Sequence, residues 1–143
     1  MTLWTALERL MRPAASLSRR DVEALFLAPL EEIGSNSAFQ FFATDGAAFE
    51  GRLPIDKLEV RVRRETERAE LVILSVAQAQ IPRPQVQDRY PRLTLTSVPR
   101  GRSLEESTEF STETSSGRLT FGFKESDPQR LAWIAFAAAT KDA

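Results

Sequence analysis

Apolar and polar residues alternate along several segments of the first half of the chain, and this is the spacing of a half-buried β-strand. In the strand predicted over 57–64, every second residue from Leu58 to Val62 is apolar and the residues between are charged. The mostly apolar run Leu71–Val76 that follows carries no charge and predicts a central strand over 70–76. Phenylalanines in 38–43 predict a further strand. These three strands form the sheet expected from the first half.

The second half repeats this alternation in 108–114 and 118–124, and a weaker strand or extended segment is predicted at 93–95. Residues 130–136 fit two structures. Asp127-Pro128 is a favourable helix start and the later alanines favour a helix, whereas a short turn after a strand favours a hairpin. We expect a strand, because the two halves of the chain then match.

Three short helices precede these strands. Apolar residues at helical spacing predict an amphipathic helix over 2–12. Ser18 is a suitable N-cap for a helix over 19–28, with Asp21 as its capping-box partner. A third helix, over 85–90, is kept short by flanking prolines.

The pattern predicts one α+β domain spanning 1–143, with an antiparallel sheet and short helices packed on one of its faces. A helix followed by strands occurs in 18–78 and again in 82–137, which suggests two units of a pseudo-repeat. The alternative is an ordinary α+β domain that happens to divide into similar halves.

Composition limits the chemistry available to the 143-residue chain. It is 42% hydrophobic and 27% charged, which suits a globular domain with a real core. With neither cysteine nor histidine it has no thiolate ligand, no disulfide and no Ser-His-Asp or Cys-His arrangement. We therefore expect no enzyme activity, no metal and no cofactor. The net charge of −1 also argues against a dedicated nucleic-acid-binding protein.

The N-terminal region does not read as a signal peptide, because Glu8 and Arg9 interrupt its apolar run. No stretch reaches the roughly 18 apolar residues that a membrane-spanning helix needs. We expect a cytoplasmic protein that does not associate with membranes.

The candidate partner-binding surface lies in 103–116, which contains four glutamates and no basic residue. Its strand should present Glu109, Ser111 and Glu113 on one exposed face, and such a face attracts basic surfaces. The preceding Pro99–Arg102 loop could grip a carboxylate or phosphate. The residues expected to contact a partner are Glu105, Glu106, Glu109, Glu113, Arg100 and Arg102. A merely solvated strand and an ordinary exposed loop are the alternatives.

A second charged feature is the group Arg61, Arg63 and Arg64 in the strand predicted over 57–64. These arginines could form a basic stripe on one face of the strand. Alternatively, they pair with acidic residues of neighbouring strands.

A short helix, a proline-rich loop and the segments Thr108–Thr114, 117–123 and Leu131–Phe136 together resemble the helix-plus-hairpin units of the β-lactamase inhibitor protein family. They are also similar to the BamE family of outer-membrane assembly lipoproteins. The resemblance implies short helices against an antiparallel sheet that serves as a protein-binding surface. Both families are exported, and the inhibitors carry disulfides, so an envelope role is not implied for this cysteine-free chain.

In size and style the chain also resembles the immunity proteins that neutralise bacterial toxins. We therefore expect a protein that binds a cognate toxin or effector and occludes its active site. The alternative is a secretion chaperone or adaptor that binds a cargo protein.

Overall fold

A computed structural model of the chain describes residues 1–12 and 17–139. Its helices are α1 (Leu3–Leu10), α2 (Arg19–Phe26) and α3 (Arg83–Arg89), with two short 3-10 turns, η1 (Gly46–Phe49) and η2 (Ala77–Ala79). Its strands are β1 (Glu31–Ser35), β2 (Phe39–Asp45), β3 (Lys57–Arg63), β4 (Arg68–Ser75), β5 (Thr94–Ser97), β6 (Ser107–Glu113), β7 (Gly117–Lys124) and β8 (Trp133–Ala138).

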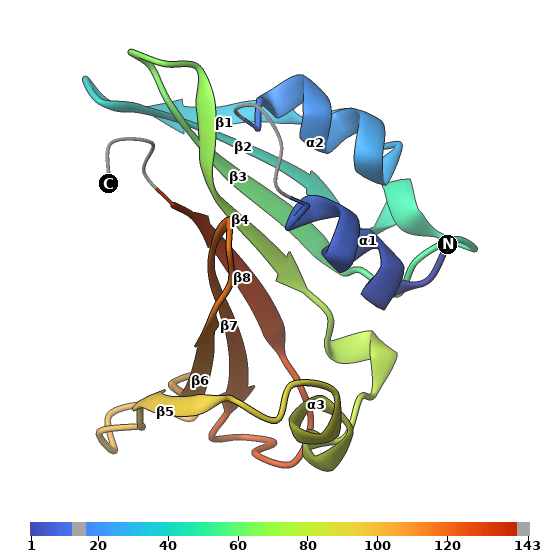
Figure 1. Cartoon of the computed structure of the whole chain (residues 1–143), viewed down its shortest axis with the longest axis vertical. Helices are drawn as coiled ribbons and strands as arrows, with labels where there is room; N and C mark the ends of the chain where they lie inside the picture. The colour runs from blue at the N-terminus through green and yellow to red at the C-terminus, as the bar shows by residue number, and fades with distance from the viewer. Residues whose placement is uncertain (13–16, 140–143) are drawn as a thin grey trace.

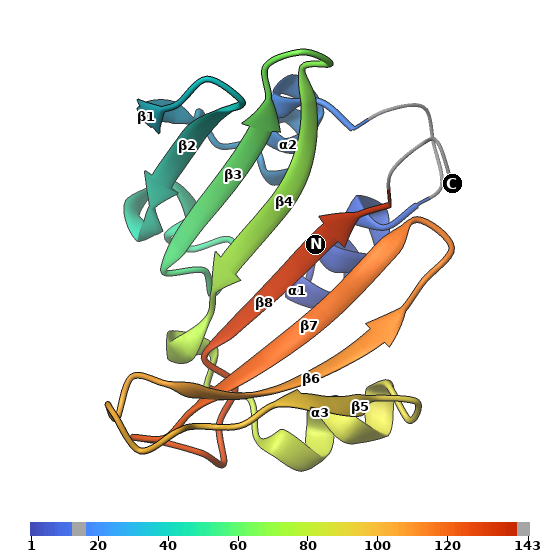
Figure 2. The same cartoon turned by 90° about the vertical axis from the view of Figure 1, so that its left-hand side faces the viewer.

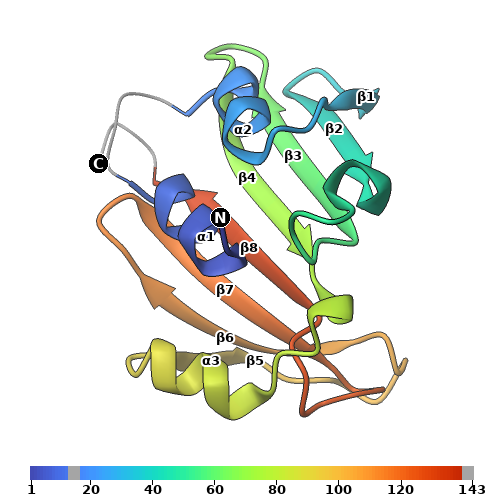
Figure 3. The same cartoon turned by 90° about the vertical axis from the view of Figure 1, so that its right-hand side faces the viewer.

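The eight strands form one open sheet in the order β1-β2-β3-β4-β8-β7-β6-β5, and all neighbouring strands are antiparallel. The three helices lie on one side of this sheet (Figure 1). Figure 3 shows that side, with the helices in front of the strands. The predicted α+β class, with an antiparallel sheet and helices on one face, is confirmed.

Each half of the chain supplies one helix followed by four adjacent strands. The segments 18–78 and 82–137 contain these halves, apart from the last residue of β8. The halves meet where β4 pairs with β8, from Leu71 opposite Ala137 to Ser75 opposite Trp133. In both halves, therefore, successive strands run from an edge of the sheet to its centre.

The hydrophobic core lies between the helices and the inner face of the sheet. Phe26 of α2 and Phe49 of η1 are fully buried there and meet edge to face, with ring centroids 6.4 Å apart. Although α1 precedes the first half in the chain, its Trp4 packs on the second half, with ring centroids 6.2 Å from Tyr90 and 6.4 Å from Phe121. The packing of helix α1 therefore helps to hold the two halves together.

Residues at its two ends determine where α2 begins and ends. The predicted capping box is confirmed: Asp21 N–H donates to Ser18 Oγ at 3.1 Å and Ser18 N–H donates to Asp21 Oδ2 at 2.8 Å. The predicted end at residue 28 was two residues too late. Leu27 adopts a left-handed conformation at φ 52°, and the Arg52 guanidinium donates to the free carbonyls of Phe26 and Leu27.

The remaining differences concern strands. The ambiguous segment 130–136 is a strand, β8, which starts three residues later than predicted because Asp127 to Arg130 form a turn. The weak strand at 93–95 is β5, a short edge strand. Strand β1 was not predicted at all, since every one of its residues is exposed and no apolar alternation marks it. None of the helices in the described part of the chain is long and apolar enough to span a membrane.

Candidate functional site

No helix of the described residues covers the face of the sheet that is turned toward the viewer in Figure 2. We call it the uncovered face. Residues at even positions of β3, such as Leu58 and Val60, are buried against the helices, so the odd positions point to the uncovered face. Strand pairing extends this assignment across the sheet. The central residues of the uncovered face are Phe39, Phe41, Arg61, Arg63, Leu71, Ile73, Trp133, Ala135 and Ala137.

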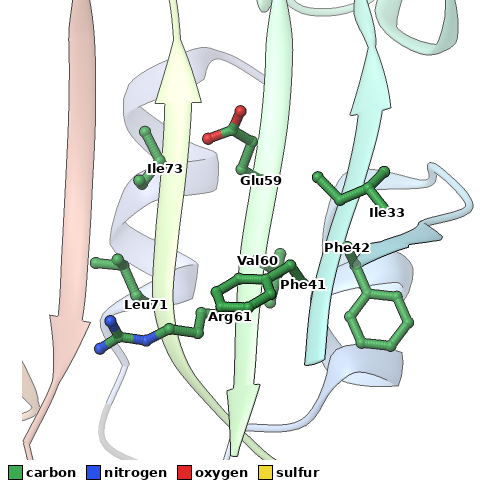
Figure 4. Close-up of a pocket in the computed structure, with 8 residues that line it drawn as sticks. All are labelled: Ile33, Phe41, Phe42, Glu59, Val60, Arg61, Leu71 and Ile73. Carbon is green, nitrogen blue, oxygen red and sulfur yellow. The ribbon is translucent and has the colours of Figure 1, made fainter. Parts of the chain in front are cut away.

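A groove of about 260 Å³ lies on this face over the first half of the sheet (Figure 4). Its lining residues are Ile33, Phe41, Phe42, Glu59, Val60, Arg61, Leu71 and Ile73. Only two of the eight carry a charge. The groove is thus mostly apolar with a cation at one end, where the guanidinium of Arg61 lies beside Leu71.

Irregular strand pairing shapes this groove. The register of β1 on β2 shifts between Glu32 and Gly34, which leaves Ile33 without a partner residue in β2. Ile33 is 63% exposed, so an apolar side chain stands free at the rim. A second shift follows Arg61 in the pairing of β3 with β4. The groove is therefore built by the strand geometry as well as by the side chains.

Arginines surround one carboxylate at the end of the groove. The Arg63 guanidinium holds Glu70 through both of its oxygens, with Nη2 3.0 Å from Oε1. This hydrogen-bonded pairing lowers the pKa of Glu70, and the nearby charges of Arg61 and Arg68 lower it further. The predicted alternative that the stripe pairs with an acidic neighbouring strand thus holds for Arg63.

Arg61 differs from Arg63 because it has no ion pair or side-chain hydrogen bond to any described residue. Its Nε is buried without a hydrogen-bond partner. The guanidinium lies 4.6 Å from the centroid of the Phe39 ring, and Arg63 lies 4.7 Å from the same ring. Phe39 therefore fixes a cation that has no carboxylate of its own. Arg64 leaves the stripe, since its Nε donates to the Asn36 carbonyl oxygen at 2.8 Å.

The glutamates predicted to contact a partner lie in or just before β6, and two of them form ion pairs. Glu105 meets Lys124 at 2.7 Å, and Glu113 meets Arg118 at 2.7 Å. Both pairs are well exposed, so they contribute little to stability. Glu109 has no ion pair within residues 1–12 and 17–139.

Ser111 lies on the same face of β6 as Glu109 and Glu113, as predicted, but its side chain is not exposed there. It is buried, and its hydroxyl hydrogen-bonds to Thr120 at 2.8 Å and to Thr96 at 3.1 Å. Edge strand β5 covers it, which the alternation of β6 alone could not reveal. The acidic strand therefore presents two separated carboxylates.

Glu106 organises the adjoining loop instead of facing outward with its neighbours. Its carboxylate accepts the backbone N–H groups of Arg100 at 3.1 Å, Arg102 at 2.7 Å and Ser103 at 3.0 Å. These hydrogen bonds, that of Arg100 first, lower the pKa of Glu106. Arg100 and Arg102 thus contact Glu106 through their backbone N–H groups. Their side chains remain available at the surface.

Sequence reasoning missed the apolar part of the groove. The signal was present in β4, where Leu71 and Ile73 are apolar although Val72 and Leu74 already fill the inner face. This apolar run was interpreted as a central strand, which β4 is, but the prediction did not extend to what would cover each face of that strand. Among the described residues, no helix covers one of the two faces.

The chain has no match among protein-family models, curated proteins or solved structures. Among the described residues, no group of three or more acidic side chains could hold a metal ion.

Proposed function

We propose that this chain is a cytoplasmic protein-binding inhibitor of the immunity type, which covers the active site of a cognate toxin or effector with the uncovered face of its sheet. In this proposal the chain performs no catalysis itself. The observation that carries it is the uncovered face, with its apolar groove, its aromatic residues and its arginines. Large exposed apolar patches with polar rims are typical of protein interfaces.

The residue types on this face are those that contribute most to protein binding. Trp, Tyr and Arg dominate interface energetics, and aromatic residues are enriched at interface centres. Trp133, Phe39 and Phe41 lie half-buried here, and the Arg61 guanidinium is stacked over the Phe39 ring. Side chains that are already fixed lose little entropy when a partner binds.

Charges of both signs extend the surface beyond the groove. Glu109 and Glu113 project from β6 on the same side of the sheet as Arg61 on β3. A surface that spans several strands with both signs of charge suits a folded partner better than a single extended peptide. This favours the inhibitor over the second candidate, a secretion chaperone or adaptor for a cargo protein. The apolar groove is what supports that candidate.

The test uses a bulky charge at the centre of the uncovered face. Ala135 of β8 points out of this face, opposite Ile73 on one side and Thr120 on the other. Tagged wild-type chain and the A135R variant would be recovered from the source cells, and bound proteins identified by mass spectrometry. We expect a stoichiometric partner that wild type retains, A135R loses, and whose activity the purified wild-type chain inhibits.

A matched control is Arg20→Gln on the exposed surface of α2, on the helix side of the sheet, which should retain the partner. The double charge reversal E109K/E113K separates the two candidates. An inhibitor that uses the acidic strand should lose about 1–3 kcal/mol of binding free energy, whereas a chaperone that uses only the groove should lose none. If A135R binds every partner as tightly as wild type, the proposal is wrong. It is also wrong if deleting the gene leaves resistance to neighbouring cells' toxins unchanged.

A further inference from the structure

The groove combines an apolar floor with one cation that the described part of the chain does not neutralise. Other cations form ion pairs: Arg63 with Glu70, Arg118 with Glu113 and Lys57 with Glu59. Among the described residues, the contact found for the Arg61 guanidinium is the ring of Phe39. An arginine fixed against an aromatic ring, with its planar N–H fork unused, is prepared to bind a carboxylate through two hydrogen bonds.

The surroundings of Arg61 strengthen this preference. Its Nε is already removed from water without a hydrogen-bond partner, which is an unfavourable state for a buried donor. Glu70 is occupied by Arg63 and is not free to rotate to Arg61 without breaking that pair. An incoming carboxylate beside the guanidinium would compensate a local excess of positive charge.

The rest of the groove requires an apolar group next to that carboxylate. Leu71 of β4 is paired directly opposite Arg61 of β3, and Ile73 lies two residues further along β4. On the other side Phe41 lies opposite Arg61 in β2. An extended segment places neighbouring side chains of one face about 7 Å apart, which is close to the spacing of residues two apart on these strands.

We propose that the groove binds an acidic–apolar segment of the protein partner, with a carboxylate on Arg61 and an apolar side chain over Leu71 and Ile73. This rests on the proposed function, because it takes the uncovered face to be a protein-binding surface. It adds the chemistry that the partner must present. A nucleic acid fits less well, since the lining holds a single free cation among the described residues and is otherwise largely apolar.

The test uses a blocked synthetic peptide, acetyl-Leu-Ser-Glu-Ser-Leu-amide, in which the glutamate and both leucines share one face of an extended strand, and its counterpart with glutamine at the centre. Each would be titrated into isotope-labelled full-length chain while amide NMR shifts are followed. We expect saturable shifts in β2, β3 and β4 with the glutamate peptide, and about tenfold weaker binding of the glutamine peptide, as loss of a charge-assisted hydrogen bond predicts.

Variants then assign the carboxylate to its arginine. Arg61→Gln should bind both peptides equally, at the level of the wild-type chain with the glutamine peptide, while R61K should be intermediate because it keeps the charge but loses the fork. Arg20→Gln makes the same charge change on the helix side and should behave as wild type. The urea midpoint of each variant verifies that it is folded.

Three results would overturn the proposal. These are equal affinity of the wild-type chain for the two peptides, no saturable shift with either peptide at millimolar concentration, and shifts that only a single-stranded oligonucleotide produces. The proposed function is tested separately. If A135R abolishes capture of the natural partner while R61Q leaves it unchanged, the uncovered face binds protein but the carboxylate assignment fails.

Discussion

Gly122 of β7 makes room for the indole of Trp133, which lies across it on the uncovered face. A Cβ added at residue 122 would overlap the indole atoms Cε2, Nε1 and Cζ2. The indole is further fixed by a hydrogen bond of 3.0 Å from Nε1 to Ser107 Oγ in β6. The G122A substitution must therefore displace the ring and break this bond.

The expected loss of stability combines two effects. Overpacking at a close contact costs about 1–3 kcal/mol, and loss of a neutral hydrogen bond costs about 0.5–1.5 kcal/mol. Trp133 is only half-buried and can swing toward solvent, which keeps the overpacking part near its lower limit. We expect G122A to lower the free energy of unfolding by about 2 kcal/mol.

Urea unfolding followed by tryptophan fluorescence and circular dichroism measures this loss. Gly34→Ala in β1 is the matched control, since a Cβ there meets no atom within 4 Å. In a Trp133→Ala background the effect of G122A should disappear, because the ring that it displaces is gone. An unchanged urea midpoint for G122A, or the same loss in the W133A background, would refute the reasoning.

Three further predictions concern the rest of the domain. Phe49→Ala should destabilise it by about 3–5 kcal/mol in urea unfolding, because the ring is fully buried. Ser18→Ala should cost about 1 kcal/mol in the same assay, because it opens the capping box at the start of α2. Glu70→Gln should flatten the acid side of the stability–pH profile, measured as the urea midpoint between pH 3 and 7. Because folding lowers the pKa of Glu70, its contribution is complete above the ordinary glutamate pKa of about 4.3 and is lost as the pH falls through the lower folded-state pKa.

Each of these has a control. Phe41→Ala, on the uncovered face, should lose less stability than F49A because Phe41 is only half-buried. Thr2→Ala tests the same kind of cap at the start of α1. Glu50→Gln removes an exposed carboxylate and should leave the pH profile unchanged. A profile of E70Q that falls as steeply as wild type in acid would show that the Arg63 pair does not act as described.

The elements that could be predicted from the sequence were those in which one side is buried and the other is polar. Strand β3 fulfils this condition at every position, and the capping box of α2 can be recognised from its residue types alone. Strand β1 could not be predicted, because Glu31–Ser35 is held by backbone pairing to β2 while its side chains remain in water. Such a strand leaves no trace in hydrophobic periodicity.

The candidate site was harder to predict for a related reason. The acidic strand was found because like charges stand close together in sequence, but the burial of Ser111 was missed because it depends on β5. The groove assembles residues from four strands, and only their pairing brings Ile33, Arg61 and Ile73 together. Sequence identified the arginine stripe. It contained no local sign that Arg61 would be left without a carboxylate while Arg63 was paired.

The junction of β4 with β8 has a consequence for synthesis of the chain on the ribosome. Strand β4 is complete well before β8, its partner and the last of the eight strands in chain order, has been made. At about 5–20 residues per second, several seconds separate the two. Throughout that interval the apolar strand Leu71–Leu74 is an open edge, the kind of template on which nascent chains pair with one another. Slow translation between β4 and β8 should therefore raise the yield of aggregate more than slow translation elsewhere.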